Sequence, residues 1–180
     1  GLIEAVGEDV VVPDGCPVDD HRGRLVMPGL IDTHIHFPQT QVIASYGTQL
    51  LDWLERYTFV EEQRFEDPEH AASVADFFLD ELFRNGTTTA VVYCSVHAQS
   101  ADAFFAAAER AGARMIAGKV MMDRNAPESL RDTAESSYRD SRALIERWHG
   151  RGRLGYAVTP RFAITSTEGQ LDAAGTLLKE

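Results

Sequence analysis

The sequence predicts an α/β fold with a parallel sheet, and three features of the chain support this prediction. After residue 27, strand-like segments rich in β-branched residues alternate with amphipathic helical segments. The clearest helix, residues 68–84, has Asp67 as a suitable N-cap and Pro68 in its first turn, and it is followed by Gly86. Parallel strands joined in this way are connected by right-handed crossovers. The periodicity alone leaves open a small doubly wound sheet or half of an eight-stranded barrel.

The chain divides into residues 1–26 and residues 27–180. In the first part, short apolar pieces are separated by turn residues such as Pro13-Asp14-Gly15, which indicates a small β segment. In the second part, strands are expected at residues 30–36, 87–93, 114–120 and 154–159. Helices are expected at residues 49–57, 68–84 and 100–111, within 128–149 from Thr133 onward, and after a capping box at residues 165–168.

Composition excludes several classes of protein. The formal net charge is −11, so a nucleic-acid polymer would be repelled by most of the surface. No apolar run approaches the roughly 20 residues of a membrane span, and no signal peptide is recognisable, so we expect a cytoplasmic protein. Cys16 and Cys94 are too few for a disulfide framework. The chain starts with Gly1 and ends within a helical pattern, so we expect it to be an internal part of a longer protein.

Two histidines at the end of the first strand predict a metal site. His34 and His36 are spaced i and i+2, so both side chains point to the same face of the strand. Imidazole nitrogens bind Zn²⁺ at roughly 2.0–2.1 Å, and enzymes with parallel sheets carry their chemistry at the carboxyl ends of strands. Asp32 either orients an imidazole or caps the hydrogen bonds of a neighbouring strand. A single strand histidine is more often a core residue, but the pair beside Asp32 favours metal binding.

Further polar residues follow the other strands at the same predicted edge. Gln39 follows the first strand, His97 the second, Lys119 or Asp123 the third, and Arg161 with Phe162 the fourth. His97 is either a surface loop residue or part of the site, and Arg161 forms either a surface ion pair or part of a pocket. The chain has no glycine-rich phosphate loop and no nucleophile elbow.

The segment from Leu25 to His36, Leu-Val-Met-Pro-Gly-Leu-Ile-Asp-Thr-His-Ile-His, resembles the first-strand signature of the amidohydrolase superfamily. Segments 37–40, 43–47, 50–59, 118–125 and 159–163 resemble the branch of that superfamily that deaminates guanine. The resemblance covers essentially all 180 residues. It implies the first half of a metal-dependent hydrolase (β/α)₈ TIM barrel over residues 27–180. Residues 1–26 would then be part of a small β-sandwich domain.

The resemblance also implies roles for individual residues. His34 and His36 would bind one Zn²⁺ per subunit, or iron, while Gln39, Arg161 and Phe162 would hold a small-molecule purine, guanine. The reaction implied is hydrolysis of guanine to xanthine and ammonia by a metal-activated water. The remaining ligands and a proton-shuttling glutamate are expected beyond residue 180, in a protein that is a homodimer. Two alternatives stay open: a cytosine or triazine hydrolase of the same superfamily, and a non-catalytic α/β module.

Overall fold

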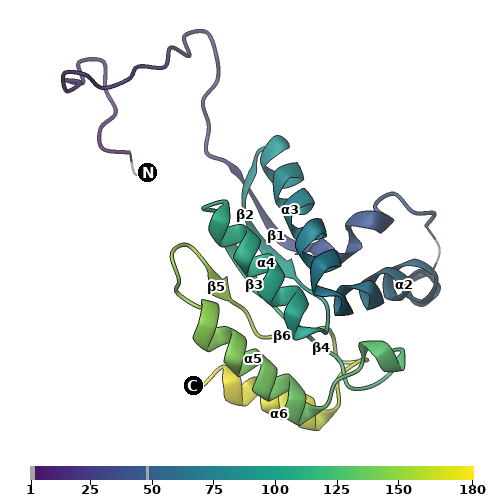
Figure 1. Ribbon diagram of the computed structural model, residues 1–180. Helices are drawn as coiled ribbons and strands as arrows, with labels where there is room; N and C mark the ends of the chain where they lie inside the picture. The colour runs from purple at the N-terminus through teal and green to yellow at the C-terminus, as the bar shows by residue number, and fades with distance from the viewer. Residues whose placement is uncertain (1–2, 48) are drawn as a thin grey trace.

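A computed structural model describes residues 3–47 and 49–180, and in it four βα units follow an extended N-terminal segment (Figure 1). The strands are β1 (Leu30–His36), β2 (Thr87–Tyr93), β3 (Arg114–Gly118), β4 (Val120–Met121), β5 (Gly155–Tyr156) and β6 (Thr159–Pro160). The long helices are α3 (Pro68–Arg84), α4 (Ala98–Arg110), α5 (Ala134–Trp148) and α6 (Glu168–Leu177). Shorter helical elements are η1 (Phe37–Val42), α1 (Leu50–Trp53), η2 (Leu54–Thr58), α2 (Phe59–Glu62), η3 (Gln63–Glu66) and η4 (Glu128–Leu130).

All the strand pairs are parallel, which confirms the predicted α/β class. The main sheet has the order β1-β2-β3-β5, and β4 pairs with β6 beyond it. In the register of the sheet, His36 lies opposite Tyr93, and Tyr93 lies opposite Gly118. The carboxyl ends of β1, β2 and β3 therefore meet at one edge.

The core lies between the sheet and the helices α3 and α4, which pack side by side against it (Figure 1). The predicted apolar stripe of α3 is buried at Ala71, Val74, Ala75, Phe78 and Leu82. Phe37, directly after β1, packs edge-on against Phe65 with ring centroids 5.1 Å apart. This packing fixes the start of the segment that follows the histidine pair.

The structure corrects two local predictions and leaves a third, the N-terminal β-sandwich segment, untested. Residues 3–29 form no strand in the structure and extend away from the sheet (Figure 1), so the predicted β-sandwich segment stays a prediction. Residues 1 and 2 of that segment lie outside the described residues. The helix expected at 49–57 is longer, because helical turns of α, π and 3₁₀ type continue through Glu66. The predicted capping box at 165–168 is wrong, since Thr167 is the N-cap of α6 and accepts from the backbone N–H of Gln170.

The third and fourth predicted strands are each divided in two. Lys119 separates β3 from β4, and residues 157–158 separate β5 from β6. The two segments approach each other closely at Gly118, where an added Cβ would overlap the carbonyl oxygen of Ala157. Within the described residues, no helix is long and apolar enough to cross a membrane.

Gly118→Ala tests this close approach of two strands. The new methyl group would force the backbone apart, so we expect a loss of about 1–3 kcal/mol in the free energy of unfolding, measured with urea. Gly175→Ala in α6 is the matched control, because its Cβ would meet open space. That change should stabilise the protein by about 0.5–1 kcal/mol. Equal stability of the two variants would contradict the close packing at Gly118.

Candidate functional site

The two histidines of β1 lie on one side of the strand, as the spacing predicts. The ring centroids of His34 and His36 are 5.3 Å apart. Tyr93 of β2 stacks on His36 with a centroid distance of 4.7 Å and lies 4.9 Å from His34. The phenol ring therefore supports both imidazoles from the neighbouring strand. Tyr93 was not among the predicted site residues, although its place at the end of β2 indicated the same edge.

His36 is held in the neutral form that a metal ligand requires. Burial, together with the positive charge of Arg161 and the neighbouring His34, lowers the pKa of His36 to about 3. Its Nδ1 atom is buried and has no hydrogen-bond partner among the described residues. A buried nitrogen lone pair without a partner is costly, and a cation would satisfy it.

The predicted binding residues share one pocket with the histidines. The pocket has a volume of about 420 Å³ and is lined by His34, His36, Gln39, Leu50, Trp53, Leu54, Tyr93, Arg161 and Phe162. Gln39 belongs to η1, directly after β1, whereas Arg161 and Phe162 follow β6. Residues more than 120 positions apart in sequence thus meet at the carboxyl edge of the sheet.

Besides Tyr93, sequence reasoning missed Glu62, which lies next to this pocket. Its side chain is 1% exposed and lies between two of the predicted binding residues. Arg161 Nη1 donates to Glu62 Oε2 at 2.5 Å, and Gln39 Nε2 donates to Glu62 Oε1 at 3.1 Å. The Arg161 guanidinium also lies over the ring of Phe59, 5.5 Å from its centroid. The spacing of Phe59 and Glu62, one helical turn apart, was the signal that could have indicated a shared face.

The other two predicted site residues, Asp32 and His97, are not among the described residues that line this pocket. Asp32 accepts a hydrogen bond from the backbone N–H of His34 at 2.9 Å, so it fixes the strand rather than an imidazole. His97 precedes α4, is half-buried, and is not one of the residues that line this pocket within the described chain. Burial lowers the pKa of His97, while the charge of Glu66 raises it.

The polar residues predicted at the end of the third strand have structural partners instead. Lys119 is buried and forms an ion pair with Asp132, which also accepts from the backbone N–H of Met122 at 3.2 Å. Asp123 accepts from the backbone N–H of Thr167 at 2.7 Å and so holds the start of α6. Cys94 is buried, and burial raises the pKa of its thiol. These residues hold the loops around the pocket in place.

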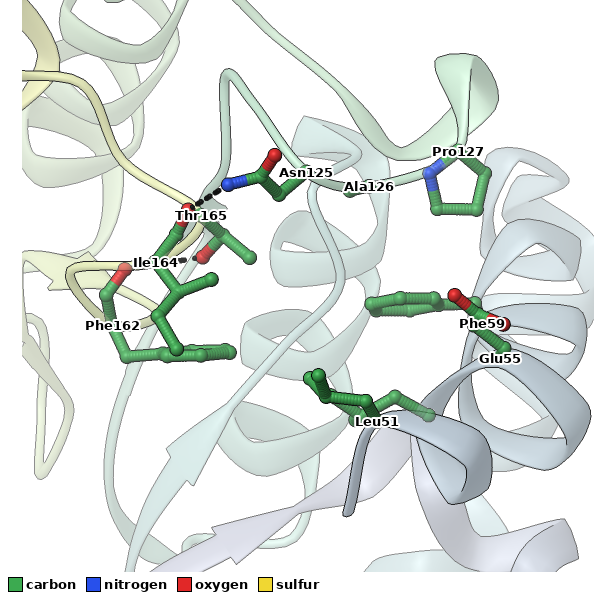
Figure 2. A pocket seen from close by; sticks show the side chains of 10 residues that line it. Leu51, Glu55, Phe59, Asn125, Ala126, Pro127, Phe162, Ile164 and Thr165 are labelled. Carbon is green, nitrogen blue, oxygen red and sulfur yellow. Dashed lines mark hydrogen bonds between the residues drawn. The ribbon is translucent and has the colours of Figure 1, made fainter. Parts of the chain in front are cut away.

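A second, larger pocket of about 580 Å³ lies beside the first and shares Leu54 and Phe162 with it. Figure 2 shows Leu51 and Phe59 on one wall and Phe162 and Ile164 on the other. Asn125 donates to the backbone carbonyl of Ile164 at 2.7 Å and so links the segment before Pro127 to the loop that follows β6. Among the described residues, no histidine lines this pocket. His34 and His36 line the 420 Å³ pocket and an adjoining one of about 360 Å³.

Comparison with known proteins identifies the class to which this site belongs. The model of the Amidohydrolase family matches residues 25–180. That match covers most of the chain and includes both histidines and Arg161. The chain therefore belongs to the amidohydrolase family.

Within that family, the chain is similar to guanine deaminases. It is 57% identical to the guanine deaminase of Escherichia coli (strain K12) over 94% of this chain and 38% of that protein. The solved structure of E. coli guanine deaminase matches with a TM-score of 0.90 and 56% identity, over 93% of this chain and 39% of that one. Guanine deaminase from C. acetobutylicum, solved with guanine in the active site, matches with a TM-score of 0.87 and 29% identity, over 93% of this chain and 41% of that one. The chain thus spans about two fifths of the length of these relatives.

His36 gives the site a pH dependence that can be measured. The folded protein keeps this imidazole neutral down to a pKa of about 3, whereas the unfolded chain protonates it near its ordinary value of 6.5. Between these values the unfolded state binds more protons, so the free energy of unfolding should decrease as the pH falls from about 6.5 toward 3. In protein treated with a chelator, His36→Gln should remove this part of the pH dependence. Identical pH profiles of urea unfolding for the parent and the variant would contradict the burial of a neutral His36.

Proposed function

We propose that the complete protein hydrolyses guanine to xanthine and ammonia with a divalent metal ion, zinc. The observation that carries this proposal is the meeting of His34, His36, Gln39, Arg161 and Phe162 in one pocket. The similarity to guanine deaminases over more than nine tenths of this chain supports the substrate. Since the chain spans only part of those proteins, activity, substrate and assembly are proposals for the whole protein.

His34 and His36 fit a metal ion as two of its ligands. Both are imidazoles on one face, and His36 is neutral with a buried nitrogen that has no partner in the part of the chain that the structure describes. A catalytic zinc site usually has three protein ligands, and residues 3–47 and 49–180 contain no group of three or more His, Cys, Asp or Glu side chains suited to a metal. We therefore propose that the other ligands, and the glutamate that moves protons, lie in later strands. When bound, zinc lowers the pKa of water to about 7 and so supplies hydroxide at neutral pH.

The remaining pocket residues suit a flat purine. Arg161 uses one nitrogen for Glu62, which leaves other N–H donors of its fork for paired acceptors such as guanine O6 and N7. Phe162 supplies an aromatic face beside the ring, and Trp53 and Leu54 exclude water from the pocket wall. Together these contacts would orient the amino-bearing carbon C2 of guanine toward the histidine end of the pocket.

Three further properties of the proposal do not follow from the pocket. Iron in place of zinc, a homodimeric assembly and a cytoplasmic location remain predictions. A cytosine or triazine hydrolase is the second enzyme hypothesis, and it is less favoured because the Arg161 fork suits the O6 and N7 acceptors of guanine. A non-catalytic α/β module is the third.

Ammonia release by the complete protein tests the choice of substrate. Guanine should be turned over at least about 10²-fold faster than adenine or cytosine at equal concentration, because adenine offers an amino group where Arg161 requires an acceptor. Turnover of cytosine without turnover of guanine would overturn the proposal. A metal-free, inactive complete protein purified without chelator would support the non-catalytic hypothesis.

Two variants separate metal binding from substrate binding. Arg161→Ala should lower kcat/KM for guanine by about 10²-fold, since hydrogen bonds from a charged group contribute about 1.5–3 kcal/mol. Its metal content should stay near that of the parent protein. His34→Ala should lower both the metal content, measured by atomic absorption, and the activity. Loss of the metal in Arg161→Ala would show that the proposed role of Arg161 is wrong.

A further inference from the structure

Glu62 is a buried carboxylate in contact with two of the proposed substrate-binding residues, yet nothing in the proposed reaction has used it. It is 1% exposed, and the Arg161 side chain paired with it is 6% exposed. The pair joins α2 to the segment after β6, 99 residues along the chain. Burying two charges is unfavourable, and the pair offsets this only with good geometry and further hydrogen bonds. Gln39 supplies one such further hydrogen bond.

The chemistry of a carboxylate determines how Gln39 is oriented. A carboxylate paired with a guanidinium accepts hydrogen bonds and donates none. The group of Gln39 that faces Glu62 must therefore be its NH₂, in agreement with the 3.1 Å contact from Nε2 to Oε1. The carbonyl oxygen Oε1 of Gln39 is then directed elsewhere. Without Glu62, the amide could turn over and present its NH₂ group instead.

We propose that Glu62 is the positioning residue that sets the hydrogen-bond polarity of the pocket. It holds the Arg161 fork in place as the donor and forces Gln39 to present an acceptor. The pocket then selects a planar heterocycle that has acceptors on the edge facing Arg161 and an N–H on the edge facing Gln39. Guanine meets both requirements through O6 and N7 and through its ring N–H groups. Adenine offers Arg161 an amino group in place of O6 and is rejected. This inference rests on the proposed function, because it assumes that the two residues face the substrate.

The neighbouring Glu61 provides a matched control on the same helix. It is also largely buried, but Arg64 Nη1 donates to its Oε1 at 2.9 Å and His70 lies 3.6 Å from it. Among the described residues, Glu61 forms no hydrogen bond or ion pair with Gln39 or Arg161, whereas Glu62 contacts both. Glu61→Gln therefore removes a carboxylate of similar burial without changing Gln39 or Arg161.

The test compares four variants of the complete, metal-loaded protein. In Glu62→Gln, the new amide can donate to the carbonyl oxygen of Gln39, which then turns toward residue 62 and leaves the NH₂ group of Gln39 facing the substrate. The KM for guanine should therefore rise about 10- to 100-fold, with a smaller change in kcat. Glu61→Gln should keep the parental KM. Gln39→Glu should also raise the KM, because two carboxylates would then face each other. In the double variant Gln39→Glu with Glu62→Gln, residue 62 donates and residue 39 again presents an acceptor, so the KM should fall at least about threefold below that of Glu62→Gln.

The lower KM of the double variant distinguishes positioning from mere structural support, because Glu62→Gln and the double variant both lack the Glu62 carboxylate. An equal or higher KM in the double variant than in Glu62→Gln would overturn the inference. A parental KM in Glu62→Gln would also overturn it. If Glu62→Gln fails to fold, Glu62→Asp retains the charge on a side chain one methylene shorter, and it should raise the KM while keeping the fold.

The proposed function itself is judged separately, by ammonia release from guanine in the parent protein. If the parent binds guanine without releasing ammonia, the deaminase proposal fails. The same four variants then test the polarity of the pocket by the dissociation constant for guanine, measured by calorimetry. If the parent turns over guanine but the KM does not rise in Glu62→Gln, or does not fall again in the double variant, only the role of Glu62 fails. A parent that neither binds nor turns over guanine would overturn both.

Discussion

Parallel strands place their carboxyl ends at one edge of a sheet, and that edge carries the candidate site of this protein. His36 and Tyr93 lie opposite each other in the register of β1 and β2. The segment after β6 brings Arg161 to the same edge, where its backbone N–H donates to the carbonyl of Met121 at 3.2 Å. An antiparallel arrangement would have sent every second strand end to the opposite edge. The direction of the strands is therefore the constraint on which the histidine pocket depends.

Local packing then sets the positions of the side chains on this edge. Phe37 anchors the chain immediately after β1 in the core, which places Gln39 at the pocket. The succession of α, π and 3₁₀ turns from Leu50 to Glu66 covers the pocket and brings Glu62 beneath Arg161. A π turn within a helical segment is often found at functional sites, because the extra residue redirects the side chains that follow it. A buried ion pair is weak evidence for stability, and here its place beside the pocket indicates that it fixes geometry instead.

The sequence alone was sufficient to predict those strands and helices whose residue patterns are local. The period of two in β1 identified the face shared by His34 and His36, and the caps around α3 fixed both of its ends. The spacing of Phe59 and Glu62 indicated a shared helical face, but the π turn η2 before them shifts the phase of the helix, so the pattern did not place Glu62 beside the pocket. Its partner Arg161 is also far away in the sequence. Asp32 had two chemically reasonable partners, an imidazole and a backbone N–H, and only the coordinates distinguish them.

The most direct measurement is a crystal structure of the complete protein with its metal and guanine. We expect one ion bound by His34 and His36, and a purine ring beside Phe162 with Arg161 on its acceptor edge. Guanine located instead in the larger pocket between Leu51 and Ile164 would contradict this. An ion bound away from the two histidines would contradict it as well.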